Sequence, residues 1–135
     1  MAGERFRTEL GEAWFDDENG IVRFAYFHGA VCNLEGAKAI LAVEEQAAGG
    51  GGSKIKGRLL PILIDMRPAG VTIDQEARAF FARIKSFSAF AFLVDSPVST
   101  IMTKIFAAVY EKELVPTKLF NSEREAIDWL HGFLE

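Results

Sequence analysis

The segment "LLPILIDMRPAGVTIDQEARAFF", Leu59 to Phe81, decides the fold. It begins with an apolar run that ends at Asp65, turns through Arg67, Pro68 and Gly70, and then takes on a helical pattern. The apolar run is continuous rather than alternating, which is typical of a strand covered on both faces by helices. We therefore expect a central strand, a turn and a helix.

The helix after the turn has a recognisable start signal. Thr72 followed by Gln75 matches a capping box, in which the hydroxyl of the first residue accepts a hydrogen bond from a backbone amide. The sequence thus predicts Thr72 as the N-cap. The residues that follow at helical spacing form one apolar stripe: Ala77, Phe80, Phe81 and Ile84.

Upstream, "AWFDDENGIVRFAYF" predicts two strands joined by a turn at residues 17–20, and hence a hairpin. From Asn33 the apolar residues follow helical spacing, with Asn33 as the expected N-cap and Gly49 as the expected stop. The run "GGGGSKIKG" then predicts a linker-like loop. It is not a phosphate loop, because it follows a helix and lacks the GK[ST] ending.

Downstream, a second continuous apolar strand is expected from Ser88 to Asp95, followed by a helix from Ser96 to about Tyr110. A short strand at "PTKLF" and a last helix capped by Ser122 complete the chain. Strands alternating with helices predict an α/β fold with a mixed, mostly parallel sheet, an N-terminal antiparallel hairpin and about four helices. At 135 residues the chain is expected to form one domain, 1–135.

Composition excludes several classes of partner. The net charge is -4 and the charges are interspersed, so we expect no nucleic-acid binding. The apolar runs are shorter than the roughly 20 residues that a membrane-spanning helix needs. Cys32 is the only cysteine and no apolar signal segment follows the start, which favours a cytoplasmic location.

Several segments together resemble the STAS domains, the fold of bacterial anti-sigma-factor antagonists, and most closely their small uncharacterised bacterial relatives. The segments that carry the resemblance are "PILIDMR", "EARAFF", "LVDSPVS", "PTKLF" and "AIDWL". The resemblance implies a non-enzymatic regulatory module whose protein partner docks on the turn from Asp65 to Asp74 and the start of the next helix. Antagonists of this family that are switched by phosphorylation carry a serine directly after the aspartate that matches Asp74. Here Gln75 and Glu76 follow it, so the resemblance does not extend to the phosphorylation switch.

Polar residues also gather where the two apolar strands end. Asp65 and Asp95 each close a strand, and Arg67 and Ser96 follow them. If the strands are neighbours, these groups meet at the carboxyl edge of the sheet, where open α/β folds bind ligands. In the alternative interpretation, Asp65 pairs with Arg67 or Arg78, while Asp95 and Ser96 only cap the following helix.

Other reactive residues lack partners in the sequence. His28 and His131 have no second ligand at metal-binding spacing, so we expect no metal and no cofactor. Cys32 fits packing better than catalysis. Since no nucleophile, base and orienting group can be assembled from the sequence, we expect no enzymatic activity.

The helix expected after Ser96 carries a surplus of apolar residues. Beside its main stripe, Met102, Phe106 and Tyr110 form a second one at i, i+4 and i+8. This stripe fits self-association in a homodimer, contact with another helix or an apolar ligand, or simply a wide core face.

A second hypothesis for function follows from the many phenylalanines. The general fold is similar to that of lipid-binding domains of the CRAL-TRIO type, which would make the protein a binder of a small apolar ligand. The residues that could line such a pocket are Phe80, Phe81, Phe87, Phe90, Phe92 and Phe106.

Overall fold

The computed structural model describes residues 4–52, 59–68, 70–95 and 115–134. Its centre is a six-stranded sheet in the order β1-β2-β3-β5-β7-β8. The first three strands are antiparallel, and β3, β5, β7 and β8 run parallel to one another. The strands are β1 (Phe6–Arg7), β2 (Gly11–Asp16), β3 (Ile21–Tyr26), β5 (Leu60–Asp65), β7 (Phe87–Leu93) and β8 (Thr117–Phe120). The expected mixed, mostly parallel α/β sheet is confirmed.

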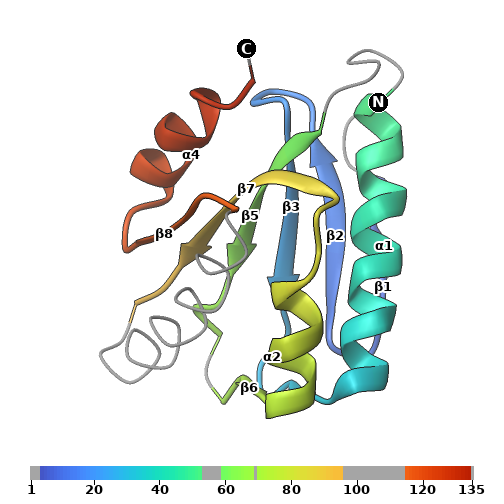
Figure 1. Ribbon diagram of the computed structural model, residues 1–135. Coiled ribbons are helices and arrows are strands. Elements are labelled where there is room, and N and C mark those ends of the chain that lie inside the picture. Colours follow the sequence, from blue (N-terminus) through green and yellow to red (C-terminus); the bar gives the residue numbers. More distant parts are fainter. Residues whose placement is uncertain (1–3, 53–58, 69, 96–114, 135) are drawn as a thin grey trace.

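The helices cover both faces of this sheet. Figure 1 shows α1 (Leu34–Gly52) and α2 (Gln75–Ala82) on one side and α4 (Glu123–His131) on the other. Strand β5 lies between β3 and β7, and its first five residues are buried. The continuous apolar run therefore forms the expected central strand, because neither of its faces meets water.

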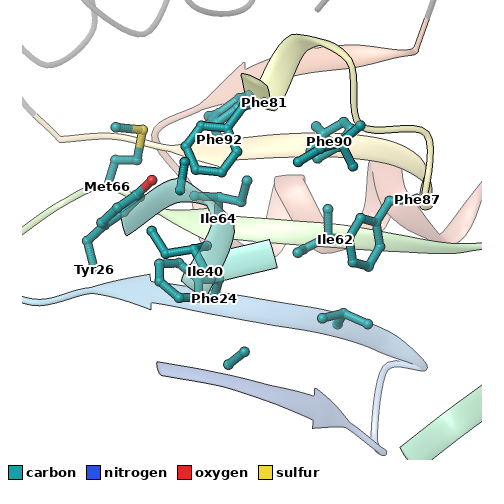
Figure 2. Packing of buried hydrophobic residues seen from close by; sticks show 14 of the residues in the cluster. Phe24, Tyr26, Ile40, Ile62, Ile64, Met66, Phe81, Phe87, Phe90 and Phe92 are labelled. Carbon is teal, nitrogen blue, oxygen red and sulfur yellow. The ribbon is translucent and has the colours of Figure 1, made fainter. Parts of the chain in front are cut away.

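The two faces of the sheet are packed with side chains of different size. Along β7, Phe90 and Phe92 point into the core below α1 and α2, whereas Ala89 and Ala91 belong to the core below α4. Figure 2 shows the aromatic cluster, in which the ring centroids of Phe90 and Phe92 are 6.5 Å apart. The small residues leave room for α4, which buries Leu130 against them.

The hairpin between β2 and β3 forms as expected. The carboxylate of Asp16 accepts hydrogen bonds from the backbone and the side chain of Asn19, and the carbonyl of Asp16 accepts one from the amide of Gly20 at 2.7 Å. Gly20 has a φ of 72°, a left-handed conformation that glycine adopts without strain. The start of α4 is also confirmed, since Ser122 Oγ accepts from the amide of Glu125.

Two predicted helix boundaries are wrong. Helix α1 starts as expected, with Asn33 Oδ1 accepting from the amide of Gly36 at 2.9 Å, but it continues past Gly49 to Gly52. Glycine lowers helix propensity without forbidding the helix, so it ends one only where the chain turns left-handed. At α2, the N-cap is Asp74 rather than Thr72.

The reason for the second error is a small sheet that the sequence did not reveal. Strand β6 (Thr72–Ile73) pairs in parallel with β4 (Val31–Cys32), separately from the main sheet. Thr72 is therefore part of an extended strand. The N-cap of α2 is Asp74, whose carboxylate accepts a hydrogen bond from the amide of Ala77 at 2.9 Å.

Three helices lie in the part of the chain that the structure describes, against about four expected. The helix expected from Ser96 to about Tyr110, with Met102 and Phe106, falls on residues 96–114, outside the described ranges. Among the described residues, no helix has both the length and the apolar character that crossing a membrane requires.

Candidate functional site

The carboxyl end of β5 carries a tight pair of charged residues. Asp65 accepts three hydrogen bonds from Arg67: one from its amide at 2.9 Å, one from Nε at 3.0 Å and one from Nη2 at 2.8 Å. These bonds to Asp65, together with the negative charges of Asp65, Glu123 and Asp95, raise the pKa of Arg67. Of the alternatives that the sequence left open, the pairing of Asp65 with Arg67 is the one that forms.

Arg67 links Asp65 to a longer chain of charges. Its Nη2 lies 3.6 Å from Glu123 Oε1, and Glu123 Oε2 accepts from Arg23 Nη2 at 2.8 Å. Arg23 Nη1 in turn lies 3.3 Å from Asp16 Oδ2. We call Asp16, Arg23, Glu123, Arg67 and Asp65 the ion-pair chain. It joins β2, β3 and the end of β5 to the first turn of α4.

Sequence reasoning missed three members of this chain, Asp16, Arg23 and Glu123. A weak signal was present, because Arg23 interrupts an otherwise apolar strand at a position facing the α4 side. Its partner Glu123 is 100 residues away, which no local pattern reveals. In the structure the side chain of Arg23 is 15% exposed and that of Glu123 is 41% exposed, so the arginine is the buried end of this pair.

The other two residues expected at this edge are Asp95 and Ser96, of which the structure describes Asp95. Asp95 is exposed just after β7, and it acts on Arg67 through its charge. Strands β5 and β7 are neighbours, as the prediction required. Ser96 lies outside the described residues.

The turn that follows Arg67 leads to a second group of polar residues. Gly70 has a φ of 80°, and a Cβ there would lie 3.2 Å from the Cα of Gly29, so this position needs glycine. The amide of Thr72 then donates to the carbonyl of Ala30 at 2.9 Å, and the amide of Asp74 to the carbonyl of Cys32 at 3.0 Å. These bonds hold the segment before α2 against β4.

We call the exposed residues between the end of β5 and the first turn of α2 the corner. They are Arg67, Thr72, Asp74, Gln75 and Glu76. Among the described residues, no hydrogen bond or ion pair joins Asp65 and Arg67 to Thr72 and Asp74. The five described candidate residues therefore do not form one cluster. Arg67 belongs to the ion-pair chain, whereas the backbone amides of Thr72 and Asp74 are bonded to β4 and the residue before it.

Beneath α1 lies a buried group of titratable residues. Glu44 is 2% exposed, and burial raises its pKa to about 8, helped by the charge of Glu45. Burial also raises the pKa of Cys32 to about 12, with further contributions from Asp74 and Glu44, and raises the pKa of Tyr26. The thiol of Cys32 therefore stays protonated at neutral pH, which agrees with packing rather than nucleophilic catalysis.

A groove of about 660 Å³ runs beside α1 on the surface. It is lined by the loop after β1, by Val31 and Asn33, and by one side of α1. Val31 is 70% exposed, which is unusual for a large apolar side chain in this structure. We call this hollow the α1 groove. Its lining residues are Arg7, Thr8, Glu9, Leu10, Val31, Asn33, Glu35, Gly36, Ala39, Ala42 and Val43.

The histidines and acidic residues of the described ranges are dispersed. In residues 4–52, 59–68, 70–95 and 115–134, no group of three or more His, Cys, Asp or Glu side chains could hold a metal ion. His28 is exposed at the end of β3, and His131 Nε2 lies 3.1 Å from the carbonyl of Asn19. Each histidine thus has a surface position apart from Cys32, which is buried.

Comparison with known families gives a direct match. The model of the family described as "Domain of unknown function (DUF7793)" matches residues 14–134, nearly the whole chain. The chain belongs to this family. None of the curated proteins matches it.

A solved structure matches the fold of this family member. It is the crystal structure of an uncharacterized protein from the DUF3478 family with a SpoIIAA-like fold, from Shewanella loihica PV-4. The match has a TM-score of 0.57 at 16% identity and covers 93% of this chain and 98% of the other. The STAS-like architecture expected from the sequence is therefore confirmed at the level of the fold.

Proposed function

We propose that this protein is a non-enzymatic bacterial regulatory module that binds a protein partner through the corner. The SpoIIAA-like fold and the STAS-like segments of the sequence support this proposal. So does the buried, protonated thiol of Cys32, which removes the most reactive side chain of the described residues from catalysis.

The observation that carries the proposal is the fixed backbone of the corner. Thr72 and Asp74 are exposed, yet their amides are bonded to β4 and the Asp74 carboxylate caps α2. A backbone that is already ordered loses little further conformational entropy when a partner binds. The corner is thus a preorganised surface rather than a loop that must first be ordered.

The corner carries charges that do not depend on phosphorylation. Gln75 and Glu76 occupy the positions after Asp74, and Thr72 lies in the short strand β6. Asp74 and Glu76 place two carboxylates at the start of α2, where the helix dipole favours them. The partner is therefore recognised by a constant acidic surface, with Arg67 beside it.

The experiment uses the tagged full-length chain expressed in its own host. Partners are captured gently and quantified by mass spectrometry, with wild type compared with an Arg67→Gln, Asp74→Ser variant. Serine keeps the N-cap hydrogen bond while removing the charge, so α2 remains intact. We expect the partner captured by wild type to fall at least tenfold.

The matched control is an Arg124→Gln, Asp128→Asn variant, which removes one charge of each sign from the exposed face of α4. It should capture as much partner as wild type. Equal capture by the corner variant and wild type would contradict docking at the corner. Absence of any partner protein would contradict the regulatory role itself.

The alternative, a binder of a small apolar ligand, predicts a different result in the same experiment. Native mass spectrometry of the captured protein would then show a bound small molecule and no second chain. The phenylalanines expected to line its pocket give it little support. Phe87, Phe90 and Phe92 are buried, and the rings of Phe87 and Phe90 pack edge to face with centroids 6.0 Å apart.

A further inference from the structure

The floor of the α1 groove is apolar although much of it is open to solvent. Ala39 and Ala42 are exposed on the side of α1 that lines the groove, and Leu10 is half-buried opposite them. Val31 adds a side chain that is 70% exposed. Apolar surface gathered in a hollow of about 660 Å³ has the size and character of a binding site.

Most polar groups on the rim of the groove already have partners. The hydroxyl of Thr8 accepts from the amide of Leu10 at 2.9 Å, and Asn33 caps α1. The guanidinium of Arg7 donates to Glu12 at 3.0 Å. Thr8 and Asn33 are thus bonded within the fold, and the charge of Arg7, whose side chain is 70% exposed, is paired with Glu12.

Two carboxylates on the rim differ from these groups. Glu9 and Glu35 are both exposed and both line the groove. Neither forms a hydrogen bond or an ion pair with any residue of the described ranges. The groove therefore combines an apolar floor with two unpaired negative charges at its edge.

We propose that the α1 groove binds a short peptide segment of a partner protein, in which a bulky apolar side chain lies next to lysine or arginine. The apolar side chain packs on Val31 and Ala39. The basic side chain pairs with Glu9 or Glu35. This site differs from the corner in every residue, so the two can be tested separately.

The shape of the groove favours an extended chain over a compact molecule. Along α1 it reaches from Glu35 to Val43, a rise of about 12 Å. An extended chain covers that length with roughly four residues. Ala39 and Ala42 have short, exposed side chains, which lets the backbone of a ligand approach the helix there, whereas Leu10 packs on Gly36.

The first test is selection from a phage library of random dodecapeptides on the full-length protein. We expect enriched sequences to combine Leu, Ile, Phe or Trp with Lys or Arg within two positions. The same selection is run on an Ala39→Phe variant, in which an exposed position receives a ring that fills the groove. Enrichment should be lost in that variant.

The second test measures the best peptide, labelled with fluorescein, by fluorescence anisotropy. A Glu9→Gln, Glu35→Gln variant should bind it at least tenfold more weakly. The control, Glu76→Gln, Glu125→Gln, removes two exposed carboxylates elsewhere and should bind within twofold of wild type. Circular dichroism checks that each variant is folded.

Several outcomes would overturn the proposal. These are no enrichment on wild type, enrichment of acidic or purely apolar peptides, or the same enrichment on the Ala39→Phe variant. Unchanged affinity in the Glu9→Gln, Glu35→Gln variant would do so as well. A failure of the corner variant in the host leaves these results unaffected, because neither Arg67 nor Asp74 lines the groove.

Discussion

The carboxylates on the two sides of the sheet have opposite surroundings. On the α4 side, Asp16, Glu123 and Asp65 each pair with an arginine in the ion-pair chain. On the α1 side, Glu44 is buried, and within the described ranges neither it nor Glu9 and Glu35 at the groove pairs with a cation.

The paired carboxylates take part in contacts within the fold. The exposed, unpaired carboxylates remain available to bind a ligand. Where charges are paired and half-buried, removing one partner destabilises the fold because the other charge is left without compensation for its lost solvation. A buried carboxyl without a cation becomes neutral instead, as the raised pKa of Glu44 shows. An exposed carboxylate without a partner stays hydrated, so it has little effect on the free energy of unfolding and can bind a ligand.

The largest expected effect concerns Glu44. Its pKa is about 8 in the folded protein and its usual value is 4.5, so the unfolded chain loses the proton first as the pH rises. The free energy of unfolding should therefore fall between about pH 4.5 and pH 8, by up to about 5 kcal/mol. In a Glu44→Gln variant this fall should disappear, which makes the variant more stable than wild type at pH 8.

Urea unfolding at several pH values measures this effect. Tyr26 and Cys32 titrate above the window, so they do not add to it. A Glu18→Gln variant is the control, because Glu18 is an exposed carboxylate in the turn of the hairpin, and it should keep the pH profile of wild type. Parallel pH profiles for Glu44→Gln and wild type would show that Glu44 is not held neutral.

The next effect comes from breaking the ion-pair chain at Arg23. An Arg23→Met variant leaves Asp16 and Glu123 without their shared cation, in a place where Arg23 is 15% exposed. We expect a loss of about 1–3 kcal/mol in the free energy of unfolding. Arg67→Gln, at the more exposed end of the chain, should cost less than about 1 kcal/mol. Equal losses would contradict the role assigned to burial.

A smaller effect distinguishes the two candidate caps of α2. Asp74→Ala removes the hydrogen bond to the amide of Ala77 and should cost about 1 kcal/mol. Thr72→Ala changes an exposed side chain of β6 and should cost less than about 0.5 kcal/mol. Thermal unfolding of both variants decides between them, and the reverse order would restore Thr72 as the cap.

The smallest effect on stability is expected at the rim of the α1 groove. A Glu9→Gln, Glu35→Gln variant should unfold within about 0.5 kcal/mol of wild type, since neither carboxylate has a partner. The same variant should lose peptide affinity, so stability and binding separate. A loss of more than about 1 kcal/mol would mean that these residues belong with the paired charges of the other side.

Much of the fold could be predicted because its signals are local. The continuous run of β5, the turn residues of the hairpin and the cap at Ser122 each depend on a few neighbouring residues. Strands β4 and β6 have two residues each and exist only because they pair with each other. Because of this pairing, Thr72 is a strand residue and not the N-cap that the sequence predicted.

The candidate site was predicted less completely for the same reason. Asp65 and Arg67 are two residues apart, and their pairing was among the alternatives. Arg23 and Glu123 meet only after the sheet and α4 have packed together. The α1 groove likewise collects residues from three separate segments, each of which is unremarkable in sequence.

Most of the account rests on docking of a protein partner at the corner, which shares Arg67 with the ion-pair chain. Photo-cross-linking in the host tests it most directly, with a photoreactive amino acid placed at Gln75 of α2 or, for comparison, at Arg124 of α4. Both positions are exposed, and neither belongs to the ion-pair chain. We expect a specific cross-linked protein when the photoreactive residue is at position 75 and none when it is at position 124. A cross-link at Arg124 alone, or at neither position, would contradict it.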